Sequence, residues 1–389
     1  MTVQALFIAL PFVFAALLAA IFFPAARLRV RAQALWSALF VFCAAKFLVF
    51  QYVGGNAFAP ELPEKLIWFW NWAYSGMCIF LAFAMAARIA RLAARTVPPL
   101  RRIPAAPRAF RLVFLPLFAW AVAAKGVYNG VKLPDVKEIV IEYPGLHPSL
   151  DGYRIVHATD IHASAASRRW RTQAIVDAVN ALDADIVCLT GDYSDGKCAA
   201  RCGCVAPLGS LKARDGVFAV TGNHEYYYDT AAWFAFYHSI GIDFIDGECV
   251  RPRAHLAVAG VADPACIRAG IPPPATAALF NSATNGEFRI LLQHRPHIGE
   301  PSQFARCDLQ LSGHTHGGVA PLMDSLVAYF NGGMSKGLYA GADGRKIYVS
   351  SGAGQWAGFP VRYFDDPEIV LITLRAAKGA VGAKGGEGE

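Results

Sequence analysis

The sequence predicts a helical membrane region followed by an α/β domain. Long stretches without charged residues are confined to the first third of the 389-residue chain. From about residue 136 onward, short β-branched apolar runs alternate with turn residues and with helical patterns at residues 168–182 and 231–240. Five of the apolar runs lead into residues that can bind metals, which suggests that the second part of the chain carries the chemistry.

Four segments are candidates for membrane spans. Residues 3–23 and 66–87 carry no charge, and residues 32–52 carry only Lys46. Each segment exceeds the ~18 apolar residues that indicate a transmembrane helix. Residues 112–131 are a weaker candidate because they contain Pro116 and Lys125, although a lysine stem can carry its charge to the interface. We expect four spans; the alternative is that these segments are buried helices of a soluble core.

The basic residues of the connecting segments predict an orientation. The connection 53–65 holds one lysine, whereas the other two connections are rich in arginine: Arg27, Arg29, Arg31 and then Arg88, Arg91, Arg95, Arg101, Arg102, Arg108, Arg111. Lys and Arg mark cytoplasmic loops. With four spans, we expect a multi-pass protein of the bacterial inner membrane with a periplasmic α/β domain; with three, that domain is cytoplasmic. The net charge of +7 therefore requires no nucleic-acid partner.

These patterns divide the chain into three parts. We expect a transmembrane helical region at residues 1–131, an α/β catalytic domain at 132–375 and a disordered tail at 376–389, which is rich in Ala, Gly, Lys and Glu. Within the domain, Cys198, Cys202 and Cys204 crowd one segment. A disulfide in an oxidising compartment and a metal knuckle both remain open for these thiols.

Residues 311–318, Leu-Ser-Gly-His-Thr-His-Gly-Gly, contain two histidines that could bind a metal. The histidines His314 and His316 follow a short apolar run that predicts a buried strand, and the glycines predict the turn that ends it. Imidazole is a common ligand of Zn, Fe, Ni and Cu. Taken alone, such a histidine pair is also compatible with a structural role.

Four further apolar runs lead into polar residues of the same kind. Residues 154–159, 185–190, 217–221 and 289–293 are followed by Asp160 and His162, Asp192 and Asp195, Asn223 and His224, and His294. Each motif alone is also typical of an ordinary turn, a helix cap or a core histidine. Open α/β sheets place their sites at the carboxyl ends of strands. Five such strand ends in succession therefore predict one shared site.

In this order, the motifs Asp-x-His, Gly-Asp-x-x-Asp, Gly-Asn-His-Glu, His and Gly-His-x-His resemble those of the calcineurin-like metallophosphoesterase superfamily. The resemblance covers roughly residues 138–374. The hydrophobic N-terminal region and the stretches 348–352, 360–362 and 367–371 are similar to its bacterial membrane-anchored branch. The resemblance implies a four-layer fold, two sheets sandwiched by helices, with a two-metal site between strand ends.

The resemblance also implies a role for each matching residue. The expected ligands of the first metal are Asp160, His162 and His316, those of the second metal are Asn223, His294 and His314, and Asp192 is the bridging carboxylate. His224 matches the histidine that faces the scissile phosphate, and Asp195 matches the carboxylate that orients it. This donor set suits Mn, Fe or Zn better than Ca or Mg, and the choice among the three stays open.

The expected function is hydrolysis of a phosphodiester or phosphomonoester by a two-metal-activated hydroxide, with His224 protonating the leaving oxygen. Gly196 and Lys197 stand where phosphoprotein phosphatases of the family carry an arginine, which disfavours that substrate class. The spans favour a lipid-linked phosphate. One alternative is a metal-dependent binding or sensor module on a membrane anchor. Another is a cytoplasmic-facing pyrophosphatase of a nucleotide-linked lipid precursor. The oligomeric state is not predicted.

Overall fold

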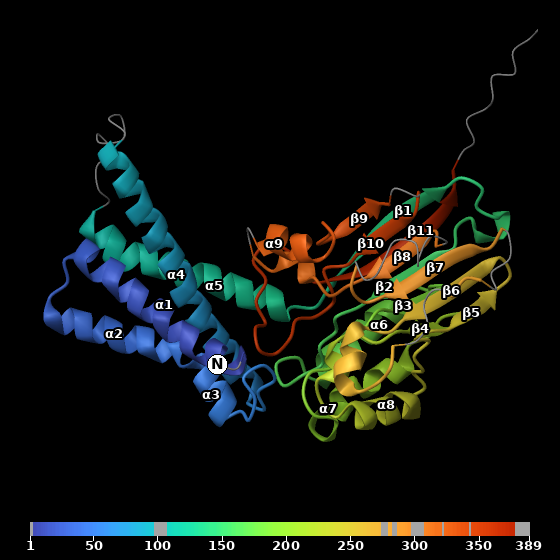
Figure 1. Ribbon diagram of the computed structural model, residues 1–389, viewed down its shortest axis with the longest axis horizontal. Coiled ribbons are helices and arrows are strands. Elements are labelled where there is room, and N and C mark those ends of the chain that lie inside the picture. The colour runs from blue at the N-terminus through green and yellow to red at the C-terminus, as the bar shows by residue number, and fades with distance from the viewer. Residues whose placement is uncertain are drawn as a thin grey trace, which may run out of the picture.

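The computed structural model describes residues 3–96, 107–273, 279–281, 286–296, 307–320, 323–341 and 344–377. The chain forms a helical bundle and an α/β domain that lie side by side (Figure 1). This arrangement confirms the predicted fold class. The expected tail lies outside the described residues from position 378 onward, and Ala376 is the last residue of a strand.

Five helices and one π-helical turn form the bundle: α1 (Val3–Ala26), α2 (Val30–Ala44), α3 (Lys46–Tyr52), α4 (Glu64–Thr96), the π-helical turn Phe110–Phe114 and α5 (Leu115–Val131). Three described segments are long and apolar enough to cross a membrane: Ala5–Ala26, Glu64–Thr96 and Phe110–Val131. The expected second span is instead a pair of helices, α2 and α3, bent by 45°. The weakest candidate thus forms a continuous helix, while a stronger one is broken at Ala45.

The bend between α2 and α3 places the only charge of this segment inside the bundle. Lys46 is fully buried. Its Nζ lies 4.2 Å from the ring centroid of Phe47 and 5.0 Å from that of Tyr74. The ring of Phe359, from the α/β domain, lies 4.8 Å away. Aromatic faces attract a cation, so the ammonium group is stabilised by rings of both parts of the molecule.

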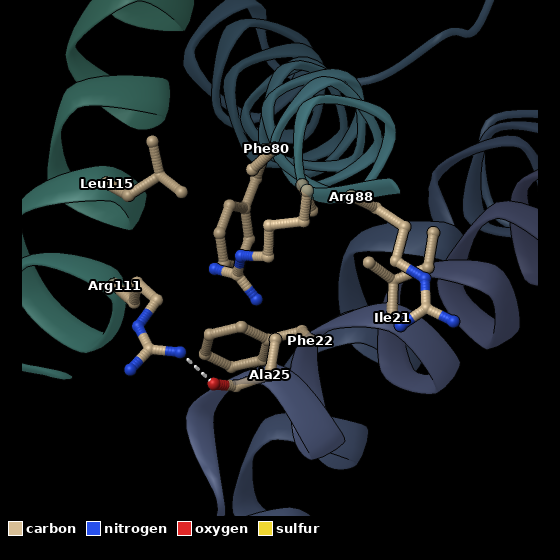
Figure 2. Close-up of a pocket in the computed structure, with 10 residues that line it drawn as sticks. Ile21, Phe22, Ala25, Phe80, Arg88, Arg111 and Leu115 are labelled. Carbon is tan, nitrogen blue, oxygen red and sulfur yellow. Dashed lines mark hydrogen bonds between the residues drawn. The ribbon is translucent and has the colours of Figure 1, made fainter. Parts of the chain in front are cut away.

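The two ends of the bundle differ in character. The end of α1, the end of α4 and the start of α5 lie away from the α/β domain (Figure 1). There Arg88, Arg91 and Arg111 line a small pocket with Phe22 and Phe80, and Arg111 donates to the carbonyl of Ala25 (Figure 2). The connection 53–63 lies at the opposite end, beside the α/β domain. The arginine-rich end and the α/β domain are therefore on opposite sides of the bundle.

Two sheets form the α/β domain. The first has the order β1-β11-β2-β3-β4, with β1 (Asp135–Tyr143), β2 (Arg154–Ala158), β3 (Ile186–Leu189), β4 (Val217–Ala219) and β11 (Glu368–Ala376). The second has the order β5-β6-β7-β8-β10-β9, with β5 (Cys249–Arg253), β6 (Leu256–Val261), β7 (Phe288–Gln293), β8 (Leu309–Ser312), β9 (Gly337–Ala340) and β10 (Lys346–Val349). Residues such as Ile155, Leu292 and Tyr348 share one buried cluster, so the sheets pack face to face.

Helices cover the outer face of the first sheet. Here α6 (Arg169–Asn180), α7 (Cys198–Val205) and α8 (Thr230–Ser239) share a second core with β2 and β3. The helices predicted at residues 168–182 and 231–240 are α6 and α8. The crowded cysteines lie on α7, and all described cysteines are free thiols. A short helix, α9 (Met323–Phe330), lies beyond β8.

The junction between the bundle and the α/β domain, called the seam below, is short and is held by several hydrogen bonds. Only residues 132–134 separate α5 from β1, and β1 pairs in parallel with β11 from Asp135 to Tyr143. Arg171 donates to the carbonyls of Val131 and Lys132 at 3.2 and 2.7 Å. Gly126 of α5 accepts a hydrogen bond of 2.8 Å from the amide of Arg362. The domain is therefore fixed to the bundle by backbone contacts.

Candidate metal centre

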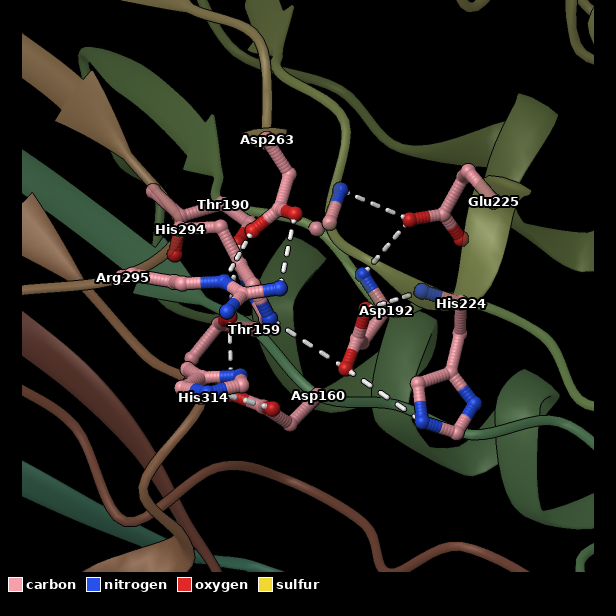
Figure 3. A network of polar contacts seen from close by, with 12 residues as sticks. Thr159, Asp160, Thr190, Asp192, His224, Glu225, Asp263, His294, Arg295 and His314 are labelled. Atoms are coloured by element: carbon pink, nitrogen blue, oxygen red, sulfur yellow. Dashed lines mark hydrogen bonds and ion pairs between the residues drawn. The ribbon is translucent and has the colours of Figure 1, made fainter. Parts of the chain in front are cut away.

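The five predicted strand ends meet at one place. The strands β2, β3 and β4 are parallel neighbours in the first sheet, and β7 and β8 are parallel neighbours in the second. Because the carboxyl ends of these strands point to the same edge, the residues that follow them converge between the two sheets. Figure 3 shows Asp160, Asp192, His224, His294 and His314 directed toward a common centre.

The backbone that presents these residues is unusual. Five of the proposed ligands have positive φ angles: Asp160 (52°), His162 (48°), Asp192 (57°), His314 (71°) and His316 (48°). The left-handed region is uncommon for residues other than glycine, and such strain collects at functional sites. The sharp turns let each strand end aim its side chain into the centre.

Asp160, His162 and His316 form a first group, whose ligand atoms lie within 4.8 Å of one another. The Nε2 atoms of His162 and His316 are 3.2 Å apart, and Nε2 of His316 is 3.4 Å from Oδ1 of Asp160. His162 and Asp160 are fully buried. Imidazole nitrogens and a carboxylate oxygen facing one another at this spacing are a suitable donor set for a cation.

Asp192, His294 and His314 form a second group of the same size. Nε2 of His294 lies 3.2 Å from Oδ2 of Asp192. Asp192 also lies 3.8 Å from Nε2 of His162, so it stands between the two groups. Asn223 is buried nearby, and its Oδ1 has no hydrogen-bond partner among the described residues. Leaving a buried oxygen unpaired is costly, and a cation here would satisfy it.

Electrostatics favour cations at both places. Burial, with the charges of His162 and Arg362, holds the pKa of His316 well below its usual range. Burial acts in the same way on the pKa of His314. Both imidazoles are therefore neutral, which is the form that binds metal. At His294, burial is outweighed by Asp192, which raises the pKa to about 10. Metal binding would displace that proton. The residues present thus fit two metal ions.

His224 and Asp195 lie beside this centre. Nδ1 of His224 is 2.6 Å from Oδ1 of Asp195, and Nδ1 of His162 is 3.0 Å from the same oxygen. The second oxygen of Asp195 accepts from the amide of Ala357 at 2.9 Å. Burial would lower the pKa of His224, but Asp192 and Asp195 outweigh it and raise the pKa to about 9. His224 is therefore a proton donor at neutral pH.

Three residues of the site were missed by the sequence analysis. Glu225 accepts from the amides of Asp192, Tyr193 and Gly222 at 2.8 to 2.9 Å. Arg362 is fully buried and lies 3.1 Å from Nδ1 of His316. Arg295 is held by both oxygens of Asp263 next to His294 (Figure 3). Glu225 had a signal in its place in the Gly-Asn-His-Glu motif, and Arg362 lies in the stretch 360–362 that resembles the membrane-anchored branch, but the sequence analysis gave neither residue a role.

Two glycines allow the backbone to approach the carboxylates. A Cβ on Gly222 would lie 2.2 Å from Oδ1 of Asp192, and one on Gly313 would lie 2.2 Å from Oδ2 of Asp160. Both distances are far below a van der Waals contact. The glycines near the histidine pair were predicted to form the turn that ends the strand, and at Gly313 the backbone also approaches a carboxylate.

The α/β domain thus carries a site whose residues fit two metal ions. Comparisons with known proteins agree with this class of protein. The family model described as "Calcineurin-like phosphoesterase" matches residues 153–318. A metallophosphoesterase of Aquifex aeolicus is 32% identical over 57% of this chain and 85% of its own length. A metallophosphoesterase of Campylobacter jejuni is 30% identical over 69% of this chain and 70% of its own length. The chain belongs to the calcineurin-like phosphoesterase family, which confirms the family that the sequence motifs resemble.

Some relatives are membrane proteins by name. The "Transmembrane protein with metallophosphoesterase domain" of Danio rerio is 34% identical over 69% of this chain and 64% of its own length. The chain thus spans less than two thirds of that relative. Among solved structures, a dimetal phosphatase from Danio rerio is 12% identical and covers 57% of this chain and 99% of its own, with a TM-score of 0.37.

Proposed function

We propose that this chain is a membrane-anchored, metal-dependent phosphoesterase. Its substrate is a phosphodiester or phosphomonoester, with a lipid-linked phosphate as the favoured class. The observation that carries the proposal is the position of Asp192 between two buried ligand groups, each with histidines and a carboxylate. The roles assigned to the nine motif residues are part of the proposal. So are the domain limits and the periplasmic placement in a bacterial inner membrane.

The metal ligands have separate tasks in this proposal. Asp160, His162 and His316 would hold one cation, Asn223, His294 and His314 would hold the other, and Asp192 would be shared between the two groups. Two such cations, when bound, neutralise the phosphoryl charge and lower the pKa of a coordinated water toward ~7. The donor set favours Mn, Fe or Zn.

The proton transfer of the proposed reaction is carried out by side chains of the protein. Asp195 holds Nδ1 of His224, so the other ring nitrogen is directed toward the centre, 3.9 Å from Oδ2 of Asp192. A proton on this nitrogen passes to the leaving oxygen as its bond to phosphorus breaks. Asp195 also fixes His162, so one carboxylate orients a metal ligand and the proton donor together.

The test is hydrolysis of bis(p-nitrophenyl) phosphate and p-nitrophenyl phosphate by the detergent-purified full chain with added Mn. Asp192→Asn and His224→Ala should each lower kcat at least 100-fold, because one removes the shared ligand charge and the other the proton donor. Asp177→Asn, on an exposed helix position, is the matched control and should keep wild-type activity. Absence of turnover by the metal-loaded wild type on either ester would contradict the proposal and favour a binding module.

A further inference from the structure

A pocket of about 440 Å³ opens directly beside His224. It is lined by two residues of the bundle, Phe58 and Ala59, and by five of the α/β domain: Asp195, His224, Tyr227, Tyr228 and Trp356. The bundle residues belong to the connection between α3 and α4. The pocket is therefore built jointly by the membrane region and the catalytic region, and neither part contains it alone.

The bundle wall of this pocket is held in place by specific contacts. Oδ1 of Asn56 accepts from the amides of Phe58 and Ala59 at 2.8 and 3.1 Å. The ring of Phe58 lies 5.1 Å from that of Phe7 in α1. An ion pair between Glu61 and Arg201 of α7 ties the same connection to the domain. These contacts fix the wall relative to both the membrane helices and the site.

The chemistry of the lining is apolar. The rings of Phe58 and Trp356 lie 6.1 Å apart across the seam, and Tyr227 and Tyr228 supply further aromatic surface. Apart from the tyrosines, the ionisable lining residues are Asp195 and His224. Nδ1 of His224 is hydrogen-bonded to the carboxylate of Asp195. Among the described residues, no lysine or arginine lines the pocket. A further charged group would lose its hydration here, and the charges of His224 and Asp195 already face each other.

We propose that this pocket binds the uncharged, largely apolar organic group that leaves from phosphorus. This inference rests on the proposed function. The substrate is then a phosphoester of an apolar alcohol, and Phe58, Ala59 and Trp356 determine its specificity. In the reaction, water supplies the oxygen that joins phosphorus, the bond from phosphorus to the ester oxygen breaks, and the proton of His224 passes to that oxygen. The alcohol is released from the pocket, and a proton from the water restores His224.

The first test is a series of alkyl phosphoesters from methyl to octyl, of whichever ester type the Mn-loaded full chain hydrolyses. Each methylene that enters the pocket should lower KM by up to about fourfold, because burying a methylene is worth ~0.8 kcal/mol. Ala59→Trp fills the pocket and should raise KM for the octyl ester at least tenfold, and it should raise KM for the methyl ester far less, because a methyl group occupies little of the pocket.

Two further variants guard against a folding defect. Trp356→Ala removes one wall and should flatten the dependence of KM on chain length, while its Tm and its bound Mn after gel filtration show that it remains folded and metal-loaded. Trp170→Ala, a half-exposed tryptophan of α6 outside the pocket, is the matched control and should retain the full dependence. A KM that does not change with chain length in the wild type, or an Ala59→Trp variant with unchanged octyl-ester kinetics, would overturn the inference.

The same assay separates the inference from the proposed function and identifies the source of the ester. If no ester is hydrolysed by the wild type, the phosphoesterase proposal fails and the pocket inference falls with it. If esters are hydrolysed without chain-length dependence, only the pocket inference fails. Turnover of a dioleoyl phosphatidate in mixed micelles, lowered by Ala59→Trp, supports the inference with a membrane lipid as source. Dependence confined to dissolved octyl ester supports it with a soluble source.

Discussion

At the scale of single residues, the site depends on side chains that never reach the substrate. Glu225 is buried, and its two oxygens accept from three backbone amides, including that of Asp192. Burial and the charge of Asp192 raise the pKa of Glu225 to about 7. The carboxylate thereby joins the loop after β3 to the loop after β4, and both loops carry proposed metal ligands.

We expect Glu225→Gln to weaken metal binding by 10- to 100-fold, the range seen when a group that supports a ligand is lost. A glutamine offers one acceptor oxygen, and its NH2 group would face a backbone N–H. The measurement is the Mn concentration that gives half-maximal activity, together with bound metal after gel filtration. Glu248→Gln, at an exposed position, is the control. Unchanged metal dependence in Glu225→Gln would contradict this role.

His157 is a second residue outside the proposed catalytic groups, and its protonation state affects the stability of the fold. It is fully buried in β2, and its Nε2 lies 2.8 Å from Oγ1 of Thr190. Burial lowers its pKa from 6.5 to about 3. The folded state therefore binds this proton more weakly than the unfolded state. The stability from neutral His157 is complete above pH ~6.5 and is lost as the pH falls toward 3.

The corresponding prediction concerns acid stability. As the pH falls from 7.5 to 5, the neutral state of buried His157 should lower the free energy of unfolding by about 2 kcal/mol, since one pKa unit is worth about 1.4 kcal/mol. His157→Gln should therefore show a smaller fall in Tm over this range than the wild type. Both proteins are measured with chelator, so that metal loss does not contribute. The control is His255→Asn, at an exposed position, whose Tm should fall as that of the wild type does; an equal fall in all three would refute the prediction.

At the scale of elements, α5 does more than anchor the domain. A Cβ on Gly130 would lie 2.4 Å from the carbonyl oxygen of Pro360, and one on Gly126 would lie 2.4 Å from the ring of Tyr363. The segment 360–363 that packs on these glycines also carries Arg362, which contacts His316. α5, the last helix of the bundle, is thus two contacts away from a proposed metal ligand.

Gly130→Ala should therefore affect both stability and the site. The carbonyl of Pro360 is backbone and must move, so we expect a Tm several degrees lower and a higher Mn requirement for activity. Gly203→Ala is the matched control. Its Cβ would meet nothing within 4 Å, and alanine favours the helix α7 by up to about 1 kcal/mol. Equal Tm values and metal requirements for the two variants would show that the seam does not influence the site.

Some elements of the fold and the site could be predicted from the sequence, and others could not. The strands and the order of motifs after them follow from hydrophobic periodicity, which is local. The rule that open α/β sheets carry their sites at strand ends predicted one shared site, and the family resemblance supplied the role of each residue. Three features could not be predicted. The break at Ala45, the contact of Arg362 with His316 and the position of Phe58 at the site all depend on packing between residues distant in the chain. The positive φ of Asp160 and His314 also has no sequence signal, because such angles usually require glycine.

At the scale of the whole molecule, charge and architecture support one orientation. The arginine-rich end of the bundle and the α/β domain lie on opposite sides (Figure 1). With the bent pair α2 and α3 counted as one span, the described helices would make four crossings, and the chain would return to the side of the domain. Cytoplasmic segments hold the excess of Lys and Arg, so we propose that the domain faces the periplasm.

The orientation can be measured with reporters. Alkaline phosphatase fused after Glu389 should be active in a bacterial host, and green fluorescent protein at the same place should be dark, because each folds only in its own compartment. The reverse pattern is expected for fusions placed within residues 97–106. A fluorescent fusion after Glu389 would contradict the periplasmic assignment and restore the cytoplasmic-facing pyrophosphatase.

The brief connection at residues 132–134 has a kinetic consequence. Because β1 begins so soon after α5 and pairs along its whole length with β11, the domain cannot swing away from the bundle. In the proposed membrane-anchored arrangement, the centre would be held at one height above the bilayer. A phosphoesterase mounted in this way would search for an embedded substrate in two dimensions. Its turnover would then follow the mole fraction of substrate in the bilayer: adding inert lipid would slow it, whereas adding buffer would not.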